Sequence, residues 1–73
     1  MLNMKKLGKN VTEMRTNEAV ILFSYETPVA AIVRGERFKT STRWSTTTQK
    51  HINRWIGGYP VEVMGQEFFW TLV

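Results

Sequence analysis

The sequence contains no cysteine and no aspartate, and its single histidine is His51. Without cysteine the chain can form neither a disulfide nor a thiolate metal site, and a reducing cytosol is its natural setting. One imidazole with scattered glutamates lacks metal-ligand spacing, and a Ser-His-acid triad would need a distant glutamate. No glycine-rich phosphate loop precedes a helix, because Gly57-Gly58 follows the predicted one. We therefore expect a protein that is not an enzyme and holds no metal or other cofactor.

Long apolar runs are also missing. No stretch approaches the ~20 apolar residues of a membrane span, and residues 1–9 lack the apolar core of a signal peptide. The 73 residues leave room for one domain, spanning 1–73. Within it, residues 1–10 predict either a flexible arm or a short docked segment. We expect an intracellular protein with no membrane and no small-molecule substrate as partner.

Acidic residues are few. Ten lysines and arginines stand against six glutamates, which gives a net charge of +4. Such an excess favours an acidic partner, either a nucleic acid or an acidic protein surface.

Alternating and apolar patterns predict strands at 11–16, 19–25, 29–34, 37–44, 61–64 and 67–72. Residues 19–25 are almost wholly apolar, as in a strand covered on both faces, so we place this strand at the centre of a sheet. Gly35-Glu36 predicts a two-residue hairpin turn of type II′, in which glycine supplies the positive φ. Gly65-Gln66 predicts a second hairpin at the end of the chain.

The period changes to that of a helix after Trp44, with Ile52, Trp55 and Ile56 on one side. Thr46 is the predicted N-cap, and Gln49 three residues later completes a capping box. Gly57-Gly58 ends the helix. The predicted order is ββββαββ, an α+β fold in which one helix packs on a small antiparallel sheet.

The candidate binding surface consists of the predicted strand 37–44 and the helix that follows it, because both carry several cations. No acidic residue occurs between Glu36 and Glu62. The candidate partner-binding residues are Arg37, Lys39 and Arg43 on the strand, and Lys50, His51 and Arg54 on the helix. Two simpler interpretations stand beside this one. The strand cations would also protect an exposed sheet edge from aggregation. His51 would also serve as a half-buried residue that packs on Trp55 or bonds a backbone carbonyl.

Two stretches carry a resemblance to a known group. Residues 24–31 (Ser-Tyr-Glu-Thr-Pro-Val-Ala-Ala) and 44–55 (Trp-Ser-Thr-Thr-Thr-Gln-Lys-His-Ile-Asn-Arg-Trp) resemble short phage-encoded proteins. In length, basicity and element order the chain is similar to the small RNA polymerase-binding transcription regulators of lytic phages. The resemblance implies a non-enzymatic host-takeover factor that binds bacterial RNA polymerase, inhibits initiation and promotes antitermination. It assigns no role to any individual residue.

Two alternatives remain open. A nucleic-acid-binding protein would use the same strand 37–43 and helix 46–56, with Asn53 and Arg54 reading base edges. Against it, the sequence shows no helix-turn-helix spacing, and Phe38 and Trp44 alternate away from the strand cations. A host-takeover adaptor with a different protein target would differ only in its partner.

Overall fold

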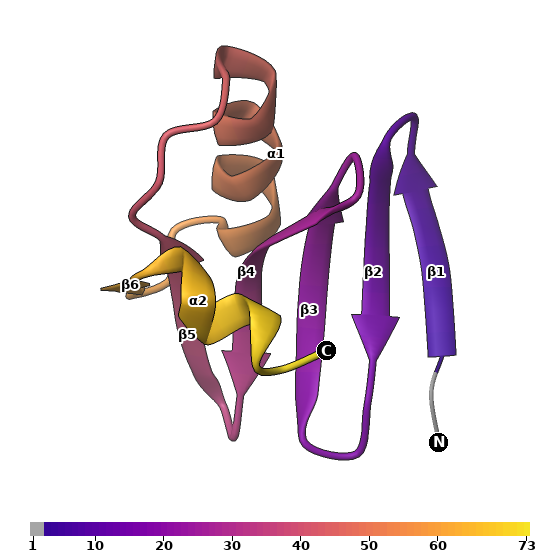
Figure 1. The fold of residues 1–73 in the computed structure, drawn as a ribbon, viewed down its shortest axis with the longest axis vertical. Coiled ribbons are helices and arrows are strands. Elements are labelled where there is room, and N and C mark those ends of the chain that lie inside the picture. The colour runs from indigo at the N-terminus through magenta and orange to yellow at the C-terminus, as the bar shows by residue number, and fades with distance from the viewer. Residues whose placement is uncertain (1–2) are drawn as a thin grey trace.

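The computed structural model describes residues 3–73, which form a single sheet with a helix on each face (Figure 1). The six strands lie in chain order: β1 (Asn3–Gly8), β2 (Val11–Arg15), β3 (Ala19–Ser24), β4 (Thr27–Val33), β5 (Glu36–Thr40) and β6 (Glu62–Met64). The helices are α1 (Thr46–Ile56) and α2 (Gln66–Trp70). The predicted α+β fold, an antiparallel sheet with a packed helix, is confirmed. Among the strands of residues 3–73, only β6 runs parallel to its neighbour, β5, because the chain passes through α1 before it returns to the sheet.

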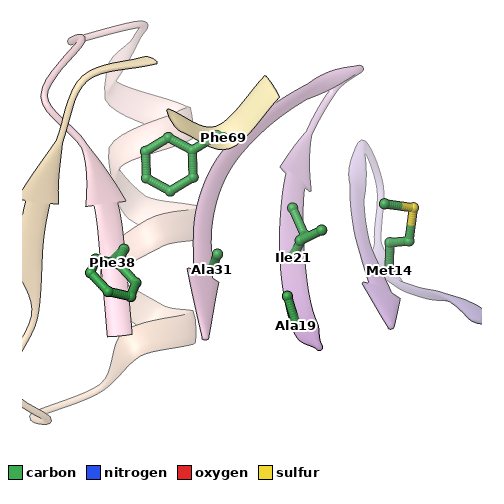
Figure 2. Close-up of a cluster of buried hydrophobic side chains, with 6 residues drawn as sticks. All are labelled: Met14, Ala19, Ile21, Ala31, Phe38 and Phe69. Atoms are coloured by element: carbon green, nitrogen blue, oxygen red, sulfur yellow. The ribbon is translucent and has the colours of Figure 1, made fainter. Parts of the chain in front are cut away.

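The two helices cover opposite faces of the sheet. Ile21 and Ala31 pack with Phe69 of α2, as Figure 2 shows, whereas the next residues along the same strands, Leu22 and Ala30, pack with α1. Neighbouring residues on a strand point to opposite faces. We call the two faces the α1 side and the α2 side.

The prediction that β3 is the central, doubly covered strand is confirmed. Ile21 and Leu22 point to opposite sides, and both side chains are 0% exposed. Ala30 and Ala31 on β4 are likewise buried, and their small side chains let both helices approach the sheet closely. The apolar core is therefore two thin layers, one on each side of β3 and β4.

The β4–β5 turn differs from the prediction by one residue and in its type, which was predicted as II′. Val33 pairs with Glu36, so the two loop residues are Arg34 and Gly35, with φ of 52° and 82°. Two positive φ values make this a type I′ turn, whose twist matches that of the flanking strands. Arg34 accepts an unfavourable conformation because Val33 and Glu36 are already held in register.

The helix start is also displaced by one residue. Ser45, not Thr46, is the N-cap of α1, and its Oγ accepts a hydrogen bond from the Thr48 amide at 3.1 Å. Ser45 has the extended backbone of a cap residue, whereas Thr46 is already helical. The predicted end at Gly57 is correct, since the Gly57 amide bonds the Asn53 carbonyl at 3.0 Å.

The predicted hairpin turn at Gly65-Gln66 and the predicted final strand, 67–72, are both wrong. Residues 66–70 form the short helix α2, which crosses the sheet in front of β4 and β5 in Figure 1. Phe68-Phe69-Trp70 lacks the polar–apolar alternation of a half-buried strand, and the α2 side needs a cover that Phe69 supplies. Phe69 is 0% exposed.

The basic strand is shorter than predicted, because β5 ends at Thr40 and residues 41–45 leave the sheet. Gln66, at the start of α2, fixes the position of the chain where it leaves the sheet after Thr40. Its Oε1 accepts bonds from Thr40 Oγ1 at 2.7 Å and from Trp44 Nε1 at 3.2 Å, and its Nε2 donates to the Pro28 carbonyl. β6 covers the outer side of β5, so the strand cations do not protect a sheet edge.

Residues 3–8, for which both an arm and a docked segment were open, form the edge strand β1 on β2. Lys5 pairs with Glu13 and Lys6 with Thr12. Among the described residues, no helix is long and apolar enough to cross a membrane.

Candidate functional site

A polar cluster attaches the first turns of α1 to the end of β3. The buried Ser24 Oγ lies 2.9 Å from Thr48 Oγ1 and 2.9 Å from His51 Nδ1. Ser45 Oγ donates to Thr48 Oγ1 at 3.2 Å. The Tyr25 ring lies 6.5 Å from that of His51. The cluster joins the two stretches that carry the resemblance, 24–31 and 44–55, and so sets the position of α1 on the sheet.

The contact between Ser24 and His51 lacks the other parts of a nucleophilic site. Ser24 is 2% exposed, which leaves no access for a substrate carbonyl. Among residues 3–73, no hydrogen bond or ion pair joins His51 to a carboxylate, the third member of a triad. The described part of the chain also holds no group of three or more potential metal ligands. The arrangement positions a helix.

A second polar contact holds the other end of α1. The Trp55 indole N–H donates to Glu13 Oε2 at 3.0 Å, and Arg15 Nε donates to Glu13 Oε1 at 3.1 Å. Glu13 is only 8% exposed, so both carboxylate oxygens are used close to the sheet. This contact fixes Trp55 above β2, the neighbour of the edge strand.

A groove of about 190 Å³ runs between α1 and the β1–β2 hairpin. Apolar side chains from the strands and helix form much of its lining, and cationic or titratable groups complete it: Leu7, Gly8, Lys9, Val11, Leu22, His51, Arg54 and Trp55. The polar contacts of Ser24 and Glu13 hold one wall, because they fix His51 and Trp55. We call this feature the α1–hairpin groove.

The cations gather on the α1 side. Strand register, helix packing and the groove lining place seven of the ten Lys and Arg residues there: Lys5, Lys9, Arg15, Arg37, Lys39, Lys50 and Arg54. Glu13 is the glutamate that register places among them, and its oxygens already accept two hydrogen bonds.

The α2 side has the opposite balance. Glu36 and Glu62 pair with Val33 and Phe38, which pack in the α2-side cluster, and Glu67 lies on α2 itself. Lys6 and Arg34 are placed on that side, Lys6 by strand register and Arg34 by a recess that it lines with Val33, Phe38 and Phe68. The molecule is therefore electrically asymmetric across its sheet, with the exposed positive charge on the side of α1.

The structure divides the six candidate residues into separate groups. His51 and Arg54 line the groove, and Lys50 is exposed on the outer surface of α1. Arg37 and Lys39 lie on β5, three strands from β2, or roughly 14 Å at normal strand spacing. The Arg37 guanidinium stacks 3.9 Å from the centre of the Tyr59 ring.

Arg43 lies in the exposed segment that leaves the sheet, so it does not continue the row of Arg37 and Lys39. His51 is half-buried, as one interpretation expected. Its bond goes to the Ser24 hydroxyl and not to a backbone carbonyl.

Sequence reasoning missed three cations of the α1 side: Lys5, Lys9 and Arg15. The position of Arg15 could have been predicted, because it lies two residues from Glu13 and four from Val11 and so shares their face of a predicted strand. Lys5 and Lys9 carried none, since their position depends on the pairing of β1 with β2, which local sequence does not reveal.

The fold and this surface define a small α+β domain with a cationic side and a shallow groove. The chain belongs to the Family of unknown function (DUF8033), whose model matches residues 2–70. No curated protein and no solved structure matches the chain.

Proposed function

We propose that this protein is a phage-type transcription regulator that binds bacterial RNA polymerase of the host through its α1 side, inhibiting initiation and promoting antitermination. The observation that carries the proposal is the charge asymmetry. Seven cations lie on the α1 side, five of them exposed and the two on β5 half-buried, and the glutamate that strand register places among them is 8% exposed. Such a surface steers and orients an acidic partner. The choice of RNA polymerase as the partner is based on the resemblance of residues 24–31 and 44–55 to short phage-encoded regulators.

The size of the domain is compatible with this role. One partner's share of a standard protein interface is ~800 Å². The molecule exposes 4972 Å², so such an interface would cover about one sixth of its surface. Inhibition by occlusion needs only binding and overlap with another factor, and no catalytic group.

The α1 side suits a protein partner better than a single-stranded nucleic acid. Stacking platforms interleave exposed aromatic rings with cations. Here Trp55 is half-buried and bonded to Glu13, and Arg37 already stacks on one face of the Tyr59 ring. Arg54 lies beside apolar groove residues, as cations do at the rim of a protein interface.

The first test is an affinity pull-down from nuclease-treated bacterial extract, followed by titration of purified polymerase. We expect polymerase subunits to stay bound after digestion. Adding the protein to an in vitro transcription reaction should lower initiation and raise terminator read-through. Loss of every partner on digestion would make nucleic acid the target, with log affinity falling by about 0.9 per phosphate neutralised as log salt rises.

A charge-matched pair of variants tests the surface. Lys50→Glu with Arg54→Glu reverses two exposed cations of α1, whereas Lys6→Glu with Arg34→Glu makes the same charge change away from it. We expect the first pair to weaken polymerase binding at least tenfold and the second to leave it nearly unchanged. Equal losses in both would mean that only net charge matters, and equal retention would remove α1 from the interface.

A further inference from the structure

The α1–hairpin groove has a lining that charge alone does not explain. Its walls combine apolar side chains from β1, β2, β3 and α1 with Lys9 and Arg54. Leu22 is 0% exposed at its base, and Trp55 closes one side. A purely electrostatic contact would need the cations but not this apolar recess.

The volume of the groove limits what enters it. Small-molecule and cofactor sites commonly enclose ~300–1,000 Å³. At about 190 Å³ the groove is smaller. A cavity of ~150 Å³ accommodates a benzene ring. The groove therefore fits one large apolar side chain, in the way that interface anchors fill pockets.

The charges beside the groove select the surroundings of that side chain. Lys9 comes from the β1–β2 turn and Arg54 from α1, so cations stand on both walls. The Glu13 carboxylate nearby is already bonded by Trp55 and Arg15 and does not neutralise them. Carboxylates that flank an apolar residue would meet these two cations as the residue enters.

We propose that the α1–hairpin groove binds one aromatic or branched aliphatic side chain from an acidic segment of the partner protein. This inference rests on the proposed function, because it names the anchor through which the same α1 side holds its partner. The apolar side chain packs against Leu7, Val11 and Trp55 above the buried Leu22, and adjacent carboxylates pair with Lys9 and Arg54. The groove supplies specificity, and the wider cationic side supplies attraction.

The Trp55 indole provides a direct readout. The probe is the blocked peptide acetyl-Glu-Glu-Phe-Glu-Glu-amide, titrated into ¹⁵N-labelled protein while the three indole N–H signals are followed by NMR. We expect the Trp55 signal to move, with Trp44 and Trp70, which lie outside the groove, as internal controls. A peptide with alanine in place of phenylalanine should bind at least about tenfold more weakly. Equal binding of the two peptides, or shifts confined to Trp44 or Trp70, would overturn the proposal.

A groove-filling substitution tests the same point without changing charge. A Cβ added at Gly8, which lines the groove, meets nothing within 4 Å, and Gly8 does not have positive φ. Gly8→Leu should therefore fold and reduce binding of the phenylalanine peptide at least tenfold. Gly58→Leu is the matched control, because Gly58 is equally open and lies outside the groove.

The same two variants separate this inference from the proposed function. If polymerase binds Gly8→Leu as well as Gly58→Leu, while the Lys50/Arg54 reversal abolishes binding, the groove inference fails and the proposed function stands. If no variant and no wild-type protein binds polymerase, the proposed function fails. Peptide binding at Trp55 then still reports on the groove. Binding of a single-stranded oligonucleotide at Trp55 in preference to the peptide would contradict the acidic protein segment.

Discussion

Trp55 on α1 donates its indole N–H to the Glu13 carboxylate on β2 across 3.0 Å, although the two residues are 42 positions apart in the chain. Glu13 also accepts from Arg15 and is only 8% exposed. The bond therefore links the end of the helix to the strand next to the sheet edge, and it shapes one wall of the groove.

Glu13→Ala leaves the Trp55 N–H without its acceptor in a poorly hydrated site. We expect a loss of about 1–3 kcal/mol in the free energy of unfolding, measured by urea denaturation. Glu13→Gln keeps an acceptor oxygen and should cost less. Glu26→Ala, in an exposed turn, is the control and should stay within about 0.5 kcal/mol of wild type. A Glu13→Ala protein as stable as this control would show that the bond is dispensable.

Ser24→Ala removes a buried hydroxyl that contacts both Thr48 and His51. Both partners lose a hydrogen bond at once, so we expect unfolding to become easier by about 1–3 kcal/mol. Ser41→Ala makes the same chemical change at an exposed position and should have little effect. Thermal unfolding of the two variants side by side measures the difference, and identical midpoints would exclude a stabilising role for the cluster.

Ser45→Ala and Thr46→Ala distinguish the observed N-cap from the predicted one. Only Ser45 accepts from the Thr48 amide. Its replacement should lower stability by about 0.5–2 kcal/mol, while Thr46→Ala should be close to neutral. Urea denaturation followed by circular dichroism reports both changes, and the reverse ranking would restore Thr46 as the cap.

The β4–β5 turn offers changes of opposite sign. Gly35 has φ of 82°, so Gly35→Ala should destabilise the protein by about 1 kcal/mol. Arg34 has φ of 52°, and asparagine tolerates this region better than arginine. Arg34→Asn creates the preferred Asn-Gly pair of a type I′ turn and should raise the melting temperature. A stabilising Gly35→Ala would contradict the assigned turn.

Two adjacent aromatic residues of α2 should differ sharply in how much their replacement lowers the free energy of unfolding. Phe69 is 0% exposed and Trp70 is 50% exposed. Phe69→Ala leaves a cavity on the α2 side and should cost about 3–5 kcal/mol. Trp70→Ala should cost far less, because half of its surface already meets water. Comparable losses on denaturation would mean that Trp70 is covered in solution.

Much of the sheet could be predicted from local patterns. The almost wholly apolar run of 19–25 correctly predicted a doubly covered strand, and the alternation of 11–16 correctly placed Glu13 and Arg15 on one face. The helix ending at Gly57 was equally clear, because capping residues act on their own neighbours. The N-cap and the β4–β5 turn were each displaced by one residue. In both places two adjacent choices fit the local sequence: Ser45 or Thr46 as the cap, and Arg34-Gly35 or Gly35-Glu36 as the turn.

The tail could not be predicted in this way. Phe68, Phe69 and Trp70 fit either a short buried strand or a helix, and the choice depends on which structure covers Ile21 and Ala31 on the α2 side. Likewise, nothing local distinguishes a flexible arm from the edge strand β1, whose hydrogen bonds all come from β2.

The sequence by itself determined the charge excess, the central strand and a helix that carries Lys50, His51 and Arg54, because these follow from composition and short-range periodicity. Tertiary structure alone decided which cations share a face. Pairing of β1 with β2 brought Lys9 opposite Arg54 across the groove. The sheet order placed Arg37 and Lys39 on β5, three strands from β2. A groove exists only between elements that are distant in the chain, so its lining follows from long-range packing, which no local pattern encodes.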